Sequence, residues 1–463
     1  MQYVSTRGEA PVLEFEETML TGLARDGGLY VPEAFPVFEA REIAEMKGLS
    51  YEEVAFRVMR PFIGGAFGDA EFREIIARSY APFRHPARCP LVQIGTNDWI
   101  LELHHGPTLA FKDVAMQLIG QMYQVALARA DRRVTIVGAT SGDTGSAAME
   151  AFRGLDRVSV VFLYPHERVS EVQRRQMSTP AEPNVHAMAV DGTFDDCQAL
   201  VKAMFNDFAF RDRIHLSAVN SINWARVLAQ VVYYFTSAIA LGAPYRPVSY
   251  SVPTGNFGDI LAGDVARRMG LPVERLVIAT NENDILHRTL ETGRSEARAV
   301  EPTIAPSMDI QVSSNFERLL FELFGRDGRA VAAAMAEQKA GGGFALPQGA
   351  VESLRAGFDS ARSGRAETMA MIARLHRETG MVIDPHTAIG VVAAEACRGD
   401  ARVPMITLGT AHAAKFPAAV EEACGVHPAL PASMADLYER AERITRVPNE
   451  LATVEAAIEE RCA

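Results

Sequence analysis

Residues 133–152 read Arg-Val-Thr-Ile-Val-Gly-Ala-Thr-Ser-Gly-Asp-Thr-Gly-Ser-Ala-Ala-Met-Glu-Ala-Phe, and this stretch decides the fold. The β-branched run 133–137 predicts a buried strand. The glycine-rich residues 138–145 predict a loop, and the small residues 146–152 predict a helix. A strand, a glycine loop and a helix in this order are typical of α/β units with parallel strands, in which ligands bind where strand ends meet helix starts.

The same rhythm returns further along the chain. Similar apolar runs predict strands at Val158–Tyr164, Ser249–Val252, Leu276–Thr280 and Pro404–Leu408. The turn-rich residues 253–259 follow the second of these runs and lead into a helix expected over Ile260–Met269. The repetition predicts an α/β fold with two open, mostly parallel α/β domains.

The rest of the chain divides around these units. Residues 1–90 have helical apolar spacing, as in 51–61 and 70–80, so we predict a mostly helical N-terminal region. We expect one α/β domain over 91–245 and a second over 246–463. The second includes a helical insertion at about 290–385, within which Met308–Val312 is expected to be a strand. A length of 463 residues fits two or three domains of roughly 150 residues.

Composition narrows the class of protein. The chain has 46 Lys and Arg against 58 Asp and Glu, a net charge of −12. This balance argues against nucleic acid as a partner, because phosphate backbones are bound by cationic surfaces. Hydrophobic residues at 48% and charged residues at 22% are ordinary for a globular enzyme. The five cysteines form no CxxC pair, so we expect neither a disulfide framework nor a cysteine metal site.

Two further patterns concern membranes and targeting. The apolar stretch Val227–Leu241 contains polar side chains and is shorter than the ~20 residues that a span needs, so it predicts a buried helix. The first residues lack the apolar segment of a signal peptide. We therefore expect a cytoplasmic protein without a membrane partner.

The segment Pro253-Thr-Gly-Asn-Phe-Gly-Asp259 predicts an anion site. Its glycines allow backbone N–H groups to converge, and the following helix adds its positive dipole end. The segment lacks the Lys-Ser/Thr pair of a Walker A loop and does not fit GxGxxG, so a single phosphate is favoured over a nucleotide. A simple βα turn is the alternative.

Residues 138–145 form a second candidate loop. The hydroxyls of Thr140, Ser141 and Thr144, together with loop N–H groups, are suited to hold a carboxylate. The alternative is structural, because Ser141 or Thr144 would also serve as a helix N-cap.

The third segment is His104-His-Gly-Pro-Thr-Leu-Ala-Phe-Lys-Asp113. Lys112 begins an apolar helix, and a lysine that faces an apolar pocket has a lowered pKa and a nucleophilic amine. The alternative is a solvated lysine at a helix start. Adjacent histidines on a strand face opposite ways and no HExxH partner follows, so we expect no metal at His104 and His105.

The three segments together indicate one cofactor. A candidate Schiff-base lysine, a carboxylate loop and a monophosphate site in an α/β context are what pyridoxal 5′-phosphate (PLP) requires.

These residues resemble the threonine synthases, fold-type-II PLP enzymes that convert O-phospho-L-homoserine and water to L-threonine and phosphate. The likeness covers nearly the whole chain, from residues 21–32 to the closing motif Leu408-Gly-Thr-Ala-His-Ala-Ala-Lys-Phe-Pro417. The Ser-Gly-Asp form of residues 141–143 fits the longer, fungal and enterobacterial-like branch. The resemblance implies the two-domain α/β fold of that class, in a monomer or a small homo-oligomer.

The resemblance also implies the site residues. Lys112 would bond to the cofactor and act in catalysis. Cofactor contacts would come from Gly255, Asn256, Phe257, Gly258, Asp259 and Thr410, with Thr410 facing the pyridine nitrogen. Substrate contacts would come from Thr140, Ser141, Asp143, Thr144, Asn220, Ser221 and Arg226, the last three toward the substrate phosphate.

Some positions stay open. Asp143 stands where related enzymes often have Asn, and its carboxylate would repel the cofactor's phenolate oxygen unless one of them is protonated or the side chain turns away. Residues 313–318 are expected to face the substrate. Lys415 is either a second phosphate contact or a helix-start charge, and Asp384 is expected to cap a helix that starts at Pro385.

Two other functions remain on the sequence alone. A phospho-lyase that acts on the same substrate and releases a keto acid would share the motifs. A binding protein without cofactor chemistry is disfavoured by Lys112 in an intact motif.

Overall fold

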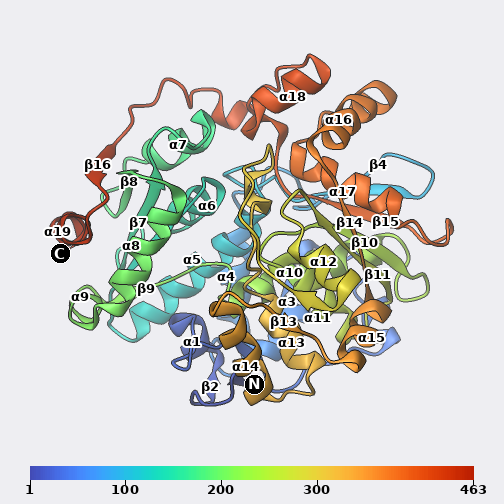
Figure 1. The fold of residues 1–463 in the computed structure, drawn as a ribbon, viewed down its shortest axis with the longest axis horizontal. Coiled ribbons are helices and arrows are strands. Elements are labelled where there is room, and N and C mark those ends of the chain that lie inside the picture. The colour runs from blue at the N-terminus through green and yellow to red at the C-terminus, as the bar shows by residue number, and fades with distance from the viewer. Residues whose placement is uncertain (463) are drawn as a thin grey trace.

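The computed structural model describes residues 1–462, which form two α/β layers joined by central helices (Figure 1). One sheet has five parallel strands, in the order β16 (Ile444–Pro448), β8 (Val185–Asp191), β7 (Val158–Pro165), β6 (Val134–Ala139) and β9 (Leu216–Ser217). The other has six, in the order β14 (Phe358–Arg362), β11 (Val273–Thr280), β10 (Val248–Pro253), β15 (Met405–Gly409), β5 (Asp98–Glu102) and β4 (Leu91–Gln93). Only the β4–β5 pair at its edge is antiparallel. The expected class, a mostly parallel α/β fold, is confirmed.

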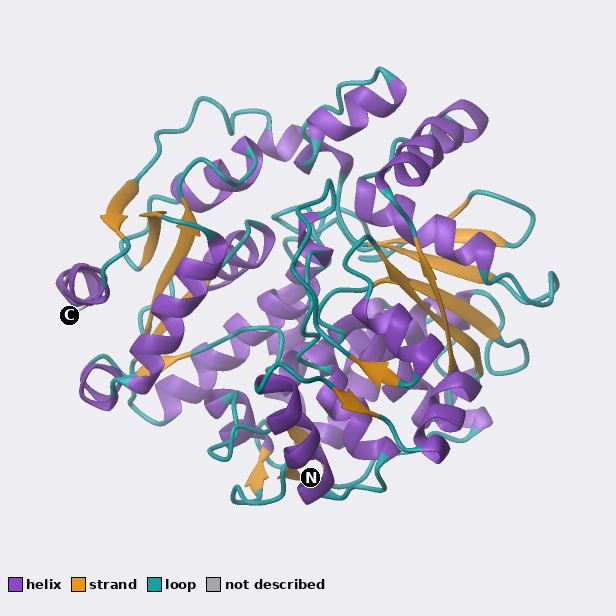
Figure 2. Cartoon of the chain, viewed as in Figure 1, coloured by secondary structure: helices purple, strands orange, loops and turns teal. Residues whose placement is uncertain are grey.

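Helices surround and separate the sheets (Figure 2). The N-terminal helices are α1 (Phe15–Thr21), α2 (Ala40–Ala44), α3 (Tyr51–Ile63) and α4 (Asp69–Tyr80). Those of the middle of the chain are α5 (Lys112–Arg129), α6 (Asp143–Phe152), α7 (Glu171–Ser178), α8 (Phe194–Asn206), α9 (Phe208–Arg213) and α10 (Trp224–Ala240). The remainder are α11 (Gly258–Arg268), α12 (Ile285–Thr292), α13 (Phe316–Leu323), α14 (Gly328–Lys339), α15 (Gln348–Gly357), α16 (Arg365–Thr379), α17 (Pro385–Ala396), α18 (Pro417–Cys424) and α19 (Leu451–Cys462).

Short elements complete the chain. A small antiparallel sheet near the N-terminus has the order β2 (Leu13–Glu14), β1 (Gln2–Ser5) and β3 (Tyr30–Pro32), and β12 (Arg294–Ser295) pairs with β13 (Phe344–Ala345). Short 3₁₀ turns are η1 (Pro306–Met308), η2 (Ala413–Lys415) and η3 (Ala432–Met434). No helix of the described residues combines the length and the apolar character that a bilayer crossing requires.

Helix α10 is the centre of the core. It lies between the two sheets in Figure 1 and packs against α3, α5 and α11. Almost every side chain from Trp224 to Ile239 is buried, as the apolar stretch predicted. A mainly apolar helix is expected to be buried, and the polar side chains Arg226 and Gln230 of α10 line a cleft. Because α10 is held on every side, the residues at its N-terminal end are rigidly placed.

The predicted strands and helices are confirmed within a few residues at their ends, but one element is wrong. Met308–Val312 is not a strand: η1 and an irregular loop occupy this segment. Pro306 starts the 3₁₀ turn, and the Asp309 carboxylate accepts hydrogen bonds from Asn281 and Thr303. These side-chain hydrogen bonds hold the segment to neighbouring loops, and they take the place of the backbone hydrogen bonds that a β-strand would form with a partner strand.

The sheets exchange strands between the predicted regions. β4 and β5 belong to the sheet of the second α/β region, whereas β16 from the end of the chain joins the sheet of the first. The region at about 290–385, expected as a helical insertion, also contributes β14 to the six-stranded sheet. Parallel pairing joins strands far apart in sequence, so an apolar run does not reveal its partner. The domain boundaries at residues 90 and 245 stay predictions.

Candidate functional site

One cleft lies where the carboxyl ends of both sheets face each other. Its walls are formed by Phe111, Lys112, Thr144, Ser221, Arg226, Gln230, the segment 253–260, Ser307, Met308, His386 and Thr410. The loops after β6 and β10 and the residue after β15 all contribute, as expected for ligand sites at strand ends. The cleft therefore brings the predicted lysine, both predicted loops and Arg226 together.

Lys112 is the first residue of α5, and its side chain is buried at the base of the cleft. The backbone N–H of Phe111 donates to the carbonyl of Thr410, which fixes the start of α5 beside the end of β15. Lys112 Nζ lies 3.3 Å from Asp143 Oδ2 and 3.5 Å from Ser307 Oγ. Burial lowers the pKa of Lys112, although the Asp143 carboxylate opposes this effect. A buried amine of this kind is suited to nucleophilic chemistry.

The loop after β10 has the shape of an anion cradle. Phe257 adopts a left-handed backbone conformation with φ +63°, and α11 begins at Gly258. The Ser313 hydroxyl donates to the Gly255 carbonyl at 2.6 Å, and the Asn315 side chain donates to the Asn256 carbonyl at 3.1 Å. These two hydrogen bonds fix the loop through its carbonyl groups. The N–H groups at the start of α11 are then available to bind an anion.

Residues 313–318 thus support the cleft rather than line it. Besides its contact with Asn256, Asn315 Nδ2 donates to the Ser221 carbonyl at 3.0 Å, so one amide joins the two segments predicted to bind phosphate. Arg318 continues this link by donating to the carbonyls of Ile222 and Tyr30.

Arg226 is a buried cation with almost no partner. It lies in the first turn of α10, which Asn223 caps through the backbone N–H of Ala225. Among the residues that the structure describes, the one hydrogen bond of its guanidinium is a long contact of 3.4 Å from Nη1 to the Val219 carbonyl, and Nε has none. Burial lowers its pKa to about 10. Buried charges are normally paired, so the geometry calls for an anionic ligand.

The neighbours of Arg226 differ in exposure. Ser221 lines the cleft and is half-buried, whereas Asn220 is exposed to solvent and does not line it. In the loop after β6, Thr144 lines the cleft and Ser141 is half-buried. The Thr140 hydroxyl is occupied, because it accepts hydrogen bonds from the N–H groups of Gly142 and Gly145, both at 2.9 Å.

Asp259 faces the core side of the cleft. Its Oδ1 accepts hydrogen bonds from the hydroxyls of Tyr233 and Tyr234, and its Oδ2 has no partner among the described residues. Burial raises its pKa to about 7, which the tyrosine hydroxyls only partly offset. A carboxyl group that takes up a proton near neutrality repels a neighbouring phosphate less than a fixed negative charge would.

The sequence analysis left the role of Lys415 open and did not identify His386 or Ser307 as residues of the site. Lys415, left open as a phosphate contact or a helix-start charge, is fully buried, with Nζ 2.9 Å from Asp143 Oδ1. His386 lines the cleft. Its Nε2 accepts the Ser307 N–H at 3.3 Å, so its Nδ1 carries the proton and donates to the Asp384 carboxylate at 2.6 Å. Asp384 caps α17 as predicted. Ser307 lies in η1, directly before the segment 308–312 that was wrongly predicted as a strand, and no local pattern identified it.

The cleft fits PLP. A buried lysine for the aldehyde, a loop of free N–H groups for the phosphate and the Thr410 hydroxyl at the end of β15 occur within one cleft. Buried polar atoms without partners, Arg226 Nε, Gln230 Oε1 and Asp259 Oδ2, also belong to residues of this cleft. Unsatisfied buried polar groups are costly in a native fold, and a polar ligand would satisfy them.

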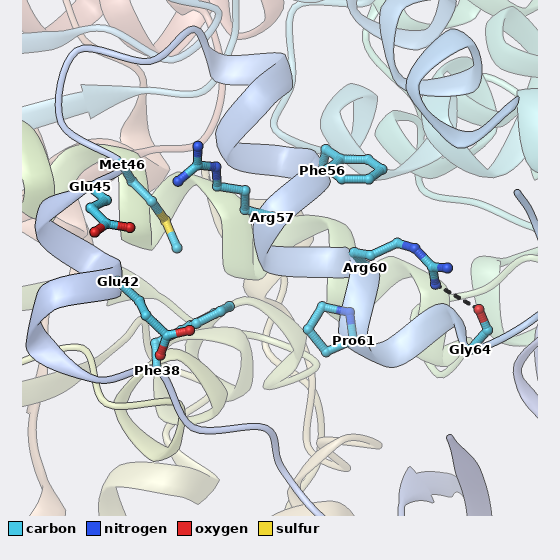
Figure 3. A pocket seen from close by; sticks show the side chains of 9 residues that line it. All are labelled: Phe38, Glu42, Glu45, Met46, Phe56, Arg57, Arg60, Pro61 and Gly64. Atoms are coloured by element: carbon cyan, nitrogen blue, oxygen red, sulfur yellow. Dashed lines mark hydrogen bonds between the residues drawn. The ribbon is translucent and has the colours of Figure 1, made fainter. Parts of the chain in front are cut away.

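A larger hollow elsewhere has a different character. A pocket of about 450 Å³ lies between α2 and α3, with Phe38, Met46 and Pro61 in its apolar wall (Figure 3). At its edge, Arg60 Nη1 donates to the Gly64 carbonyl at 2.7 Å. It contains no lysine or histidine, so it lacks the groups that PLP chemistry needs.

Comparisons with known proteins agree with the geometry. Residues 2–80 match the family model "Threonine synthase N terminus", 85–342 match "Pyridoxal-phosphate dependent enzyme", and 387–458 match "Threonine synthase, C-terminal". Threonine synthase from Pseudomonas aeruginosa is 56% identical over 99% of this chain and 98% of that protein.

Solved structures give the same result. The crystal structure of PLP-bound threonine synthase from Brucella melitensis has a TM-score of 0.98 and 55% identity, and covers 100% of this chain and 99% of that chain. The yeast threonine synthase structure has a TM-score of 0.95 and 41% identity, and covers 99% and 98%.

Proposed function

Because the chain belongs to the threonine synthase family of PLP-dependent lyases, we propose that its substrate is O-phospho-L-homoserine, converted with water to L-threonine and phosphate. The observation that carries the choice of substrate is Arg226. This buried guanidinium has no carboxylate partner among residues 1–462 and shares a cleft with Lys112. A phosphorylated amino acid supplies both an amine for the chemistry and an anion for Arg226.

PLP is the cofactor, and when bound it supplies an aldehyde that bonds to an amine and a ring that delocalises charge from the substrate α-carbon. We assign the covalent bond to Lys112. The segment 254–259 would hold the cofactor phosphate, and the Thr410 hydroxyl would donate to the ring nitrogen. A hydroxyl supplies no negative charge there, so the protein must gain rate by orienting the reacting bonds.

Lys112 also moves protons in this assignment. Its amine is buried and has a lowered pKa, so a fraction of it is neutral and can accept the proton of the substrate α-carbon through Nζ. The same Nζ then serves the neighbouring β-carbon, and the walls of the cleft limit the access of water.

The substrate is held at its two charged ends. Arg226 offers a bidentate donor to the substrate phosphate, with Ser221 as a further donor. The contact predicted for Asn220 would require this exposed side chain to turn toward the cleft. Thr140, Ser141, Thr144 and the loop N–H groups would bind the α-carboxylate, with Asp143 beside them. Since the Thr140 hydroxyl already accepts two internal hydrogen bonds, its remaining contribution is the single proton that it can donate.

The test is product analysis with the purified holoenzyme. Incubation with O-phosphohomoserine should release threonine and inorganic phosphate in equal amounts. Phosphate accompanied by a keto acid and no threonine would identify the phospho-lyase instead.

The role of Lys112 is tested separately. Borohydride reduction of the holoenzyme followed by peptide mapping should give a pyridoxyl adduct at Lys112. Lys112→Ala should remove the adduct and the activity, whereas Lys202→Ala, at an exposed lysine on α8, should leave both intact. An adduct at another lysine would overturn the assignment.

A further inference from the structure

Lys415 is a fully buried charged group beside the cleft. It ends η2, shortly after β15, and its side chain has no exposed surface. An isolated buried ammonium is strongly unfavourable, so its partners show what it does.

The surroundings of Lys415 Nζ identify it as a cation. Three acceptors lie around the nitrogen: the Thr108 carbonyl at 2.8 Å, Asp143 Oδ1 at 2.9 Å and Gln176 Oε1 at 3.0 Å. An ammonium group has three N–H donors and satisfies all three acceptors. A neutral amine has two N–H donors and would direct its lone pair at the third acceptor.

Asp143 is bound more tightly by Lys415 than by Lys112. Its Oδ1 also accepts from Gln173 Nε2 at 2.8 Å, so this oxygen has two short contacts. Its Oδ2 has two long contacts, 3.3 Å to Lys112 Nζ and 3.3 Å to Ser307 Oγ. Burial raises the pKa of Asp143, but the charges of Lys415 and Lys112 outweigh it and hold the pKa well below its usual range.

Lys112, in contrast, has no environment that fixes three protons. Its nitrogen has the two long contacts to Asp143 and Ser307, and it lies 4.9 Å from the centre of the Phe111 ring. The positive charges of Lys415 and Arg226 face it from η2 and α10 and lower its pKa further. One carboxylate is thus shared by two lysines, of which only Lys415 is fully coordinated.

We propose that Lys415 is a positioning residue that neutralises Asp143, so that the amine of Lys112 is free to remain uncharged. The inference rests on the role proposed for Lys112. In this proposal Lys415 and Asp143 form the ion pair of the cleft. Asp143 then accepts a hydrogen bond from Lys112 Nζ and orients it, but does not stabilise the protonated form of Lys112.

Other charged groups around these side chains do not change the balance. Asp113 of α5 acts on Lys415, but its own carboxylate accepts the hydroxyl and the N–H of Thr108 at 2.6 and 2.8 Å. Asp259 of α11 is the other carboxyl group that acts with Lys112, and burial raises its pKa to about 7. Asp143 is therefore the one carboxylate of the described residues within ion-pair distance of both lysines.

The test measures the protonation of Lys112 without cofactor or substrate. The full chain, freed of PLP with hydroxylamine, is labelled with acetic anhydride across a pH range, and Lys112 is quantified by mass spectrometry against the exposed Lys202 in the same sample. In Lys415→Met, Lys112 becomes the only cation in contact with Asp143. Its labelling midpoint should rise by about one pH unit or more, a tenfold or greater loss of reactivity below the midpoint.

Two further variants separate charge from structure. Lys415→Met combined with Asp143→Asn removes both charges, so the midpoint of Lys112 should return toward that of the unmodified chain. Lys415→Arg keeps the cation and should shift the midpoint less than Lys415→Met does, and it provides the comparison if the methionine variant does not fold. A structural role alone would not give this reversal.

The outcomes are distinct. An unchanged midpoint in Lys415→Met, or a double variant that remains as shifted as the single one, overturns the inference. Neither result affects the borohydride test, which depends on the holoenzyme. A missing adduct at Lys112 in that test would overturn the proposed function instead.

Discussion

Replacement of Arg226 by methionine should weaken phosphate binding without destabilising the fold. Burial lowers the pKa of Arg226 from its ordinary value to about 10. The difference of about 2.5, at 1.36 kcal/mol for each pH unit, is a cost of about 3 kcal/mol for keeping the group charged. Both values lie above pH 8, so at neutral pH the guanidinium is charged in the folded and the unfolded chain and the full cost applies. Methionine fills much of the space without the charge.

The expected result is therefore a free energy of unfolding that does not fall, and that rises by up to about 3 kcal/mol in the PLP-free chain. Arg318→Met is the matched control. Burial lowers the pKa of Arg318 as well, to about 9, but its guanidinium donates to the carbonyls of Tyr30 and Ile222 and to the Asn315 side chain. Its loss leaves two buried acceptors and one partly buried acceptor unpaired, at about 1–3 kcal/mol for each buried one, so this variant should be destabilised.

The assay is urea unfolding of the full chain at pH 7.5, with and without inorganic phosphate. Phosphate should stabilise the unmodified chain by an amount that grows with its concentration, because it binds the folded state. Arg226→Met should lose the part of this stabilisation that comes from phosphate bound at Arg226 and keep the part that comes from phosphate bound at the segment 254–259. Equal destabilisation of Arg226→Met and Arg318→Met, or full phosphate stabilisation of Arg226→Met, would show that Arg226 is a structural residue.

Three further predictions concern the support of the cleft. The raised pKa of Asp259 stabilises the fold fully below about pH 4, and this stabilisation is lost as the pH rises to about 7. Asp259→Asn should therefore reduce the difference in unfolding free energy between pH 5 and pH 8 by about 3 kcal/mol, and an unchanged difference would contradict this. In Gly255→Ala the new Cβ would lie 2.6 Å from the Ser307 carbonyl oxygen, which is too close for an undisturbed loop. The PLP affinity, measured by equilibrium dialysis, should therefore fall at least about tenfold, and an unchanged affinity would show that the clash does not occur. Asn315→Ala should lower PLP and phosphate affinity together, because one amide binds the Asn256 and Ser221 carbonyls, and loss of only one affinity would argue against that link.

Local sequence patterns were sufficient for most of the individual elements. Local sequence predicts β7 and β11 from their β-branched runs and α10 from its apolar stretch. In each case the hydrophobic pattern and the residues that end it lie within the element or next to it. Pairing was different. Nothing in residues 98–102 shows that they add to the sheet that contains β15, and nothing in 444–448 shows that they return to β8, because those choices depend on the packing of the whole chain.

The same limit applies to the site. Motifs located Lys112 and the loop after β10, since each is a local device with a characteristic sequence. Lys415 and Ser307 act through contacts with residues more than a hundred positions away, and neither is distinguished from an ordinary polar residue by its neighbours in sequence. The role of Lys415 could be inferred only from the structure, which shows the acceptors around its Nζ.

The charges of the cleft explain how a chain of net charge −12 can select a phosphorylated substrate. Lys415 is matched by Asp143, and burial raises the pKa of Asp259 to about 7. Arg226 is then the unmatched charge of the cleft. At physiological salt, exposed charges beyond about 8 Å are largely screened, so the acidic surface opposes the substrate only weakly. Selection therefore takes place at short range, where an anion that reaches Arg226 replaces a partner that the fold itself does not supply.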